Sequence, residues 1–189
     1  MNIMVVGVGG QGSLLASKLL GRLLVDEGYD VKVSEVHGMS QRGGDVQSNL
    51  RLSTEPIYSD LIQNGRADLI ISMEPMEALR YVSCLSESGW VVSSSTPYKN
   101  IPNYPEEQAL SEELNSLPRV VTLDIEQVAK DGGTPKSANI VLLGMAARYI
   151  EILSPEELRE AIKRVFAAKG EKVVEANLKA FDMGLETIK

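Results

Sequence analysis

Hydrophobic and polar residues along this chain recur with two periods, one typical of β-strands and one typical of α-helices. The apolar run Ile3–Val6 predicts a short buried strand, and leucines at helical spacing between residues 14 and 24 predict the helix that follows it. Residues 31–36 and 46–52 alternate between apolar and polar side chains, which predicts two further strands. A strand, a helix and a strand in this order are typical of an α/β fold.

The connection between the second and third predicted strands is too short for a helical crossover. It spans residues 37–45, about nine residues, whereas parallel strands need a connection of roughly a dozen residues or more. We therefore expect these two strands to be antiparallel neighbours joined by a glycine-rich loop. The sheet as a whole is then mixed.

The middle of the chain continues with strands and helices. Apolar runs predict three more strands, at residues 67–72, 90–94 and 120–123. Helical spacing predicts a helix that begins at Pro75 and is ended by Gly89. The proline-rich residues 95–118 predict mostly loop, with one helix near residues 106–114.

Three helices are expected to close the chain. The first covers residues 137–153, the second begins at Ser154, and the third covers residues 171–185. Pro155 suits the first helical position, and Ser154 with Glu157 has the spacing of a capping box, in which each residue satisfies a backbone amide of the other.

These elements predict a single domain over residues 1–189 of the α/β class. We expect a three-layer α/β/α, Rossmann-like domain with a mixed, mostly parallel sheet and C-terminal helices. The composition agrees, because 43% hydrophobic residues supply enough apolar side chains for one sizeable core.

The charge of the chain limits its partners. Nineteen Lys and Arg against twenty-six Asp and Glu give a net charge of −7, and a chain this acidic lacks the broad basic surface that non-specific nucleic-acid binding needs. The first residues contain neither a basic segment nor a long apolar run. We therefore expect a cytoplasmic protein that neither spans a membrane nor binds nucleic acid.

Cys84 is the only cysteine, and it restricts the redox chemistry of the chain. One thiol forms no internal disulfide and cannot hold an iron–sulfur cluster, which needs about four thiolates. We expect Cys84 to lie on the helix after Pro75 as a small buried residue. The sequence shows no zinc pattern and no catalytic triad, so we predict neither a metal site nor a catalytic residue.

The first group of candidate site residues follows the first predicted strand: Gly7, Gly9, Gly10, Gln11 and Gly12. Glycines between a strand and a helix allow close backbone approach, and the helix N-terminus favours an anion. Three interpretations stay open: tight packing of helix on sheet, a phosphate or ligand site, and a full dinucleotide site. In the last, Glu35 would bind a ribose.

The second group lies in the loop between the second and third strands: His37, Gly38, Ser40, Gln41, Arg42, Gly43 and Gly44. Its glycines supply flexible backbone and its polar side chains supply donors, a combination that is common in functional loops. The guanidinium of Arg42 can bind a phosphate or carboxylate through two parallel hydrogen bonds. A solvated hairpin is the alternative. We expect both groups at the carboxyl edge of the sheet.

The chain resembles the gamma-type subunit or domain of pyruvate/2-oxoacid:ferredoxin oxidoreductases. The residues that carry this resemblance are Gly7–Gly12, His37–Gly44, Ala67–Ile70, Asn139 with Leu142–Gly144, and Ala176–Phe181 with Gly184. They span nearly the whole chain in order, and the two glycine clusters at this spacing are the most specific part. The intact His37 loop and the length of the chain most resemble the beta subunits of indolepyruvate ferredoxin oxidoreductases.

This resemblance implies an accessory subunit that is inactive alone. The complete enzymes decarboxylate an arylpyruvate oxidatively, giving an acyl-CoA, carbon dioxide and reduced ferredoxin. The resemblance implies that a larger alpha subunit carries the thiamine diphosphate and the iron–sulfur clusters. Ferredoxin would then meet this chain only through the complex, and coenzyme A is a further candidate ligand.

Two other functions remain open from the residues alone. One is a self-contained dinucleotide-binding protein, either an NAD-dependent enzyme or a sensor. The other is a homo-oligomeric binding module without chemistry, and a homodimer of the isolated chain would fit it. The short glycine-rich connection after the second strand argues against the dinucleotide alternative, because a crossover helix is expected there.

Overall fold

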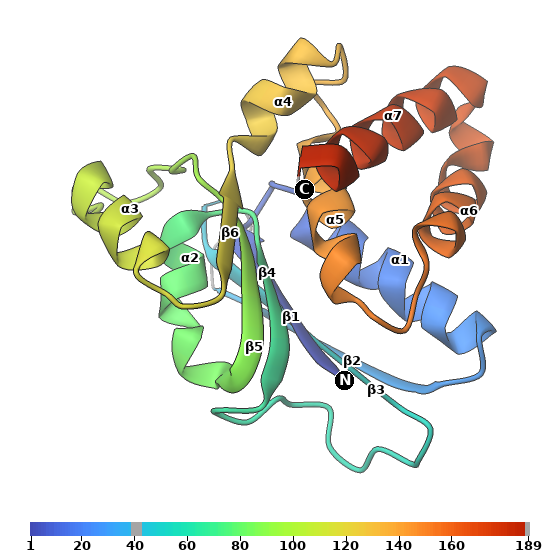
Figure 1. The fold of residues 1–189 in the computed structure, drawn as a ribbon, viewed down its shortest axis with the longest axis horizontal. Coiled ribbons are helices and arrows are strands. Elements are labelled where there is room, and N and C mark those ends of the chain that lie inside the picture. Colours follow the sequence, from blue (N-terminus) through green and yellow to red (C-terminus); the bar gives the residue numbers. More distant parts are fainter. Residues whose placement is uncertain (39–42, 188–189) are drawn as a thin grey trace.

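The computed structural model describes residues 1–38 and 43–187, and it builds them around one six-stranded sheet (Figure 1). The strands are β1 (Asn2–Val8), β2 (Asp30–His37), β3 (Asp45–Ser53), β4 (Ala67–Ser72), β5 (Leu85–Ser94) and β6 (Val120–Leu123). Their order in the sheet is β2-β3-β1-β4-β5-β6. Only β3 runs against its neighbours, so the expected mixed, mostly parallel sheet is confirmed.

Helices cover both faces of this sheet (Figure 1). The α-helices are α1 (Ser13–Asp26), α2 (Pro75–Arg80), α3 (Glu107–Asn115), α4 (Ile125–Asp131), α5 (Ala138–Ala146), α6 (Pro155–Phe166) and α7 (Glu171–Thr187). Short 3₁₀ turns are η1 (Val82–Cys84), η2 (Ala147–Tyr149) and η3 (Ala167–Lys169). Helices α1, α5, α6 and α7 lie on one face, and α2 and α3 lie on the other. The three-layer arrangement is therefore confirmed.

Strand β1 is buried on both faces because successive side chains of a strand point to opposite sides. Ile3 and Val5 belong to the core under α1 and α5 to α7, whereas Met4 and Val6 belong to the core under α2 and α3. All four side chains are at most 1% exposed. This is why an uninterrupted apolar run, rather than an alternating one, marks the central strand in the sequence.

The helix that begins at Pro75 is shorter than the sequence predicts. It ends at Arg80, and strand β5 begins at Leu85 instead of Trp90. Gly89 does not end a helix but lies within β5, where a side chain would approach the carbonyl oxygen of Ala67 to 2.7 Å. A strand that must pass so close to its neighbour needs glycine at that position.

Cys84 lies in the 3₁₀ turn η1, not on a helix as expected. Its predicted burial is confirmed, because the residue is only 9% exposed. The thiol lies 3.4 Å from the side-chain oxygen of Asn64. Its role in this position is packing and a weak hydrogen bond.

The C-terminal half departs from the prediction at two places. Helix α5 stops at Ala146 and gives way to η2, so the single helix expected over residues 137–153 was wrong. Helix α4 was not predicted. Its start is capped by Asp124, whose carboxylate accepts a hydrogen bond from the amide of Gln127 at 2.8 Å.

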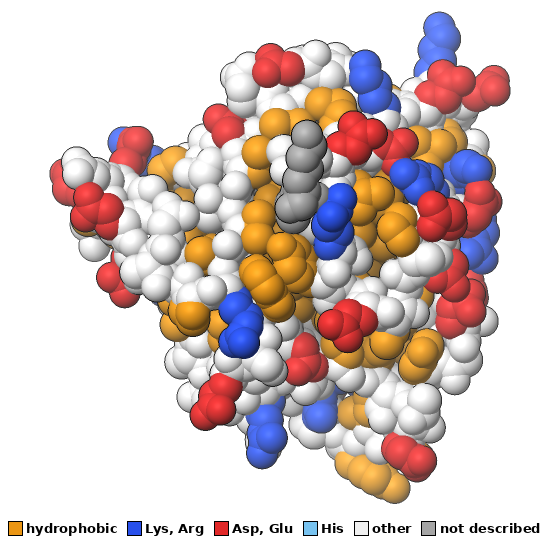
Figure 2. Space-filling model, in the orientation of Figure 1, with side chains coloured by type: hydrophobic (Ala, Val, Ile, Leu, Met, Phe, Trp, Pro, Cys, Tyr) orange, Lys and Arg blue, Asp and Glu red, His pale blue; other side chains and the backbone are white. Residues whose placement is uncertain are grey.

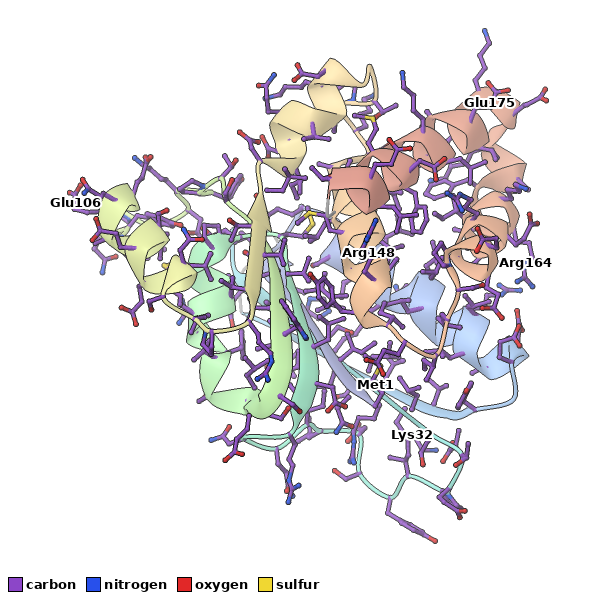
Figure 3. The ribbon with its side chains drawn as sticks, viewed as in Figure 1. Met1, Lys32, Glu106, Arg148, Arg164 and Glu175 are labelled. Atoms are coloured by element: carbon purple, nitrogen blue, oxygen red, sulfur yellow. The ribbon has the colours of Figure 1, made fainter. Side chains whose placement is uncertain are left out.

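The predicted capping box of α6 is confirmed. The hydroxyl of Ser154 accepts from the amide of Glu157 at 3.2 Å, and the carboxylate of Glu157 accepts from the amide of Ser154 at 2.6 Å. Figure 3 shows two arginines in this helical layer. Arg164 of α6 pairs with Asp26 of α1 at 3.2 Å, and Arg148 of η2 donates to the carbonyl oxygen of Leu185 at 3.1 Å.

Figure 2 shows hydrophobic side chains gathered over the middle of one face, between strands β4 and β5 and helix α5. The rings of Trp90 and Tyr149 belong to the partly buried layer around the main core, and their centroids lie 4.5 Å apart. Within residues 1–38 and 43–187, no helix is long and apolar enough to cross a membrane.

Candidate functional site at the carboxyl edge of the sheet

The chain leaves neighbouring strands β1 and β4 toward opposite faces of the sheet. Strand β1 leads into α1 on one face, and β4 leads into α2 on the other (Figure 1). Such a reversal opens a crevice beyond the carboxyl ends of the two strands, where ligands of open α/β folds usually bind. Residues 9–12 follow β1 directly and therefore lie at this point.

The two glycine clusters meet at this edge through backbone hydrogen bonds. The amide of Gly9 donates to the carbonyl oxygen of Gly44 at 2.8 Å, and the amide of Gly43 donates to that of Gly9 at 3.3 Å. The side-chain amide of Asn100 donates to the carbonyl oxygen of Gly43 at 2.7 Å. We call residues 9–12 with 43 and 44 the glycine edge. Its predicted place at the carboxyl end of the sheet is confirmed.

Gly10 and Gly12 give the first loop its shape. Their φ angles are +105° and +83°, a backbone region that side chains other than glycine rarely adopt. A side chain on Gly10 would meet no described atom within 4 Å, whereas one on Gly12 would come within 2.8 Å of the side-chain nitrogen of Asn139. Gly12 is also the N-cap residue of α1, so the first amides of that helix face the edge.

Gln11 and Gly7 hold the loop to the sheet. The side-chain oxygen of Gln11 accepts from the amide of Val8 at 2.8 Å, and its nitrogen donates to the carbonyl oxygen of Met73 at 3.3 Å. Gly7 lies inside β1, and a side chain there would come within 3.0 Å of the Cβ of Met73. Both residues thus fix the first loop between the ends of β1 and β4.

The second loop is described only at its two ends. The amide of Gly38 donates to the carbonyl oxygen of Asp45 at 2.9 Å, which closes the hairpin between β2 and β3. His37 is the last residue of β2, and its ring lies 3.6 Å from the carboxylate of Glu35. The predicted site residues Ser40, Gln41 and Arg42 lie outside the described residues.

The position of β2 departs from that in a dinucleotide fold. Strand β3 is inserted between β2 and β1, so Glu35 is two strand spacings, about 10 Å, from the strand that precedes the glycine loop. In the dinucleotide arrangement those two strands are neighbours, which brings the acid onto the ribose. Here the carboxylate of Glu35 faces His37 instead.

A buried carboxylate at the end of β4 was not found by sequence reasoning. Glu74 is 0% exposed and caps α2 by accepting from the amide of Glu77 at 2.9 Å. It also accepts from the amide of Tyr98 at 3.3 Å and from the hydroxyl of Tyr104. Glu74 therefore anchors the loop after β5 over the carboxyl edge, next to the glycine edge that Asn100 reaches. Glutamate is an unusual N-cap residue, so its position before Pro75 gave little signal.

A second polar cluster lies beside Glu74. Burial raises the pKa of Glu77, although its carboxylate accepts from Arg80 at 2.9 Å. The hydroxyl of Tyr81 donates to Asp45 at 3.4 Å, and burial together with the charge of Asp45 raises the pKa of Tyr81 to about 12. Burial and the hydrogen bond to Glu74 raise the pKa of Tyr104 as well. Both phenols are therefore protonated donors at neutral pH.

Among the described residues, no group of three or more His, Cys, Asp or Glu side chains could hold a metal ion. The edge instead presents glycine backbone and helix amides, which suit an anionic or backbone-recognising partner.

The family profile of pyruvate ferredoxin/flavodoxin oxidoreductases matches residues 2–187. The chain belongs to this family. The indolepyruvate oxidoreductase subunit IorB of Pyrococcus horikoshii is 36% identical over 199 residues, and the alignment covers all of this chain and 96% of that protein. This member is accordingly a subunit of a multisubunit 2-oxoacid:ferredoxin oxidoreductase, as its glycine clusters predict.

Two solved structures share the fold of this family member. The gamma subunit of a keto/oxoacid ferredoxin oxidoreductase from Geobacter sulfurreducens superimposes with a TM-score of 0.71 at 27% identity, over 98% of this chain and 96% of that one. A 2-oxoglutarate:ferredoxin oxidoreductase from Magnetococcus marinus, solved with 2-oxoglutarate, coenzyme A and succinyl-CoA, gives a TM-score of 0.75 at 22% identity. It matches 98% of this chain but only 30% of its own chain.

Proposed function

We propose that this chain is the accessory subunit of an arylpyruvate-type, indolepyruvate:ferredoxin oxidoreductase. It completes the active-site environment of a larger catalytic subunit and has no turnover alone. The observation that carries the proposal is the hydrogen-bonded pair of glycine loops. They lie at the edge of the sheet where the connections after β1 and β4 leave toward opposite faces. The substrate class rests on the similarity to the indolepyruvate oxidoreductase subunit over the full length of the chain.

Because this chain has a single thiol, we place electron transfer on another chain. Cys84 is buried on the α2 side of the sheet, and one thiolate does not suffice for an iron–sulfur cluster. We propose that the larger subunit holds the clusters and the thiamine diphosphate. The complex delivers electrons to ferredoxin, and this chain shapes the site without handling electrons.

The glycine edge fits a phosphate-bearing cosubstrate such as coenzyme A. No described atom lies within 4 Å of the place that a side chain on Gly10 would occupy, so the described residues leave room for a ligand to approach the backbone there. The first amides of α1 supply donors and a partial positive charge to an anion. Coenzyme A, when bound, supplies the thiol that accepts the acyl group. A 2-oxoglutarate:ferredoxin oxidoreductase that shares this fold in part of its chain was solved with coenzyme A bound, which makes coenzyme A a reasonable candidate ligand.

The decisive experiment compares the chain alone with the assembled enzyme. The purified chain should show no 2-oxoacid-dependent dye reduction. The same chain co-expressed with its larger, cysteine-rich partner should co-purify with it and reduce the dye with indolepyruvate and coenzyme A. Steady turnover by the chain alone, with no partner detectable by mass spectrometry, would contradict the proposal.

Variants of Arg42 test whether the second loop, which ends in Gly43 and Gly44 of the glycine edge, belongs to the functional surface. Arg42→Ala should lower the activity of the complex or its coenzyme A affinity roughly ten- to a hundredfold, the usual loss for a charge-assisted hydrogen bond. Arg42→Lys keeps the charge but loses the planar fork, so it separates geometry from charge. The melting temperature of the free chain is the control. If the complex with Arg42→Ala matched the wild type in assembly, coenzyme A dependence and rate, the second loop would be an ordinary solvated hairpin without a binding role.

A further inference from the structure

A cleft lies among the C-terminal helices, and one of its lining residues, Asn139, contacts Gly12 of the glycine edge. Its lining residues come from the turn between α4 and α5, the start of α5, the end of α6, the 3₁₀ turn η3, the first half of α7 and Leu15 of α1. Figure 1 shows where these elements lie in the helical layer. Its volume is about 560 Å³, which lies in the range of small-molecule pockets. Because three lysines stand around it, Lys136, Lys169 and Lys172, we call it the lysine cleft.

The lysine cleft is positive in a chain that is negative overall. The net charge of the chain is −7, but no Asp or Glu is among the described residues that line the cleft. None of its three lysines forms an ion pair with a described residue. Glu175 of α7, labelled in Figure 3, is exposed and is not part of the lining. Like charges gathered without partners repel one another, so an anion between them lowers the energy.

The floor of the cleft offers both apolar and polar contacts. The ring of Phe166 lies under Lys169, with the lysine nitrogen 5.3 Å from the ring centroid, and Val173 continues the apolar surface. Asn139 and Asn177 add polar side chains from α5 and α7. Lysine nitrogens act as point charges that suit phosphate groups, while an apolar floor suits a planar or hydrocarbon body.

We propose that the lysine cleft binds a small phosphate-bearing molecule of nucleotide size. The three lysines are not part of the glycine edge, and the proposal does not rest on the function proposed above. One contact connects the two sites: the side-chain amide of Asn139 donates to the carbonyl oxygen of Gly12 at 3.2 Å. Occupancy of the cleft is thereby linked to the residue that caps α1 at the glycine edge.

Calorimetric titration of the full chain with three probes tests the proposal. ADP and inorganic pyrophosphate should bind, with affinities that fall as salt rises because the contacts are ionic. Adenosine, which lacks phosphate, should bind at least tenfold more weakly than ADP, since it forgoes the charge-assisted contacts. Adenosine binding as tightly as ADP would overturn the assignment of the lysines to phosphate.

Two lysines are suited to mutation because they stand free of the core. Lys136→Gln with Lys172→Gln keeps both side chains polar and shortens each by one atom, removes both charges and should weaken ADP binding by roughly tenfold or more. Lys169 is left intact because it packs on Phe166. Lys179→Gln is the matched control: it lies on α7, is exposed and does not line the cleft.

Four further results would overturn the proposal. The first is the absence of binding of ADP and pyrophosphate at millimolar concentration. The second is equal ADP affinity in the double variant and the wild type. The third is displacement of ADP by a short acidic peptide at equal concentration, which would make the cleft a docking surface for a protein partner. The fourth is a loss of ADP affinity in Lys179→Gln as large as that in the double variant, which would show that the effect comes from net charge and not from the cleft.

Discussion

At the scale of single residues, the glycine edge contains glycines with different reasons to be glycine. Gly7 is required by the proximity of Met73, and Gly12 by its φ of +83° together with Asn139. Gly10 has a φ of +105°, and a side chain there would meet no described atom within 4 Å. Gly10 thus combines backbone freedom with a position that the described residues leave open to a ligand or partner.

Gly12→Ala should destabilise the chain more than Gly10→Ala. Both changes force a side chain into the positive-φ region, at a cost of roughly 1–2 kcal/mol. The first also displaces the side chain of Asn139 and removes its hydrogen bond to residue 12, about 1 kcal/mol more. Urea unfolding of both variants measures the difference. In an Asn139→Ala background the two costs should converge, and a difference that persists there would refute this explanation.

Tyr81 should make the stability of the chain depend on alkaline pH. Its pKa is raised from an ordinary value near 10 to about 12 in the fold. Its contribution is therefore fully present below pH 10 and is lost as the pH rises through 12. Unfolding free energies between pH 9 and about 12 should fall less steeply in Tyr81→Phe than in the wild type. Identical slopes would show that Asp45 and burial do not hold the proton on this phenol.

At the scale of elements, caps and close backbone contacts fix the C-terminal helices against the sheet. The capping box starts α6, and Asp124 starts α4. Helices α5 and α7 cross where each carries a glycine. A side chain on Gly144 would overlap the carbonyl oxygen of Phe181, and one on Gly184 would overlap that of Val141. The two helices therefore touch backbone to backbone.

Ser154→Ala should weaken the start of α6. The hydroxyl satisfies an otherwise unpaired amide of the first turn, and removal of such a cap costs about 0.5–2 kcal/mol. Thermal and urea unfolding measure the loss. Ser111→Ala in α3 is a control, because the Ser111 side chain is exposed and does not cap its helix. Equal effects in both variants would mean that the box adds no stability.

Gly184→Ala should force α5 and α7 apart. The new methyl group meets backbone atoms of Val141 that cannot move independently, and overpacking of this kind costs about 1–3 kcal/mol or more. Gly21→Ala is the control in α1, because a side chain there meets a methyl group of Val33 at 3.3 Å, which is side chain and not backbone and can shift by a few tenths of an ångström. That variant should destabilise the chain less than Gly184→Ala, since alanine favours helix over glycine. A stable Gly184→Ala variant would contradict the observed crossing.

At the scale of the whole molecule, the inserted strand β3 separates this fold from that of NAD-binding proteins. It moves Glu35 away from the first glycine loop and aligns both glycine loops along one edge. The result is an edge suited to a partner or cosubstrate, with a second, lysine-lined cleft among the C-terminal helices.

The isolated chain should bind NAD weakly or not at all. The carboxylate that would hold the ribose lies beside His37 on the same face of strand β2, two strands away from β1, so the usual contacts of a dinucleotide site are missing. Calorimetry of the chain with NAD measures this directly. A low micromolar affinity that disappears in Glu35→Ala would reverse the order of the two functional interpretations.

The sequence by itself determined the elements whose signals are local. The period of the apolar residues placed β1 to β4 and β6, and the nine-residue connection after β2 required the antiparallel pair because no crossover fits that length. The capping box at Ser154 and the two glycine clusters could also be recognised from the sequence, since capping and backbone freedom depend on residues that are close in the chain.

Only the tertiary structure decided the features that depend on distant residues. Strand β5 begins at Leu85, within the helix that the sequence predicts. Pairing with β4 stabilises a strand there more than the helical spacing of the apolar residues stabilises a helix. Glu74 joins the site because Tyr98 and Tyr104 come back to it from the loop after β5. The lysine cleft exists because α7 and the turn before α5, about 35 residues apart, fold side by side. No local pattern carries such contacts, because they arise from packing and not from the spacing of neighbouring residues.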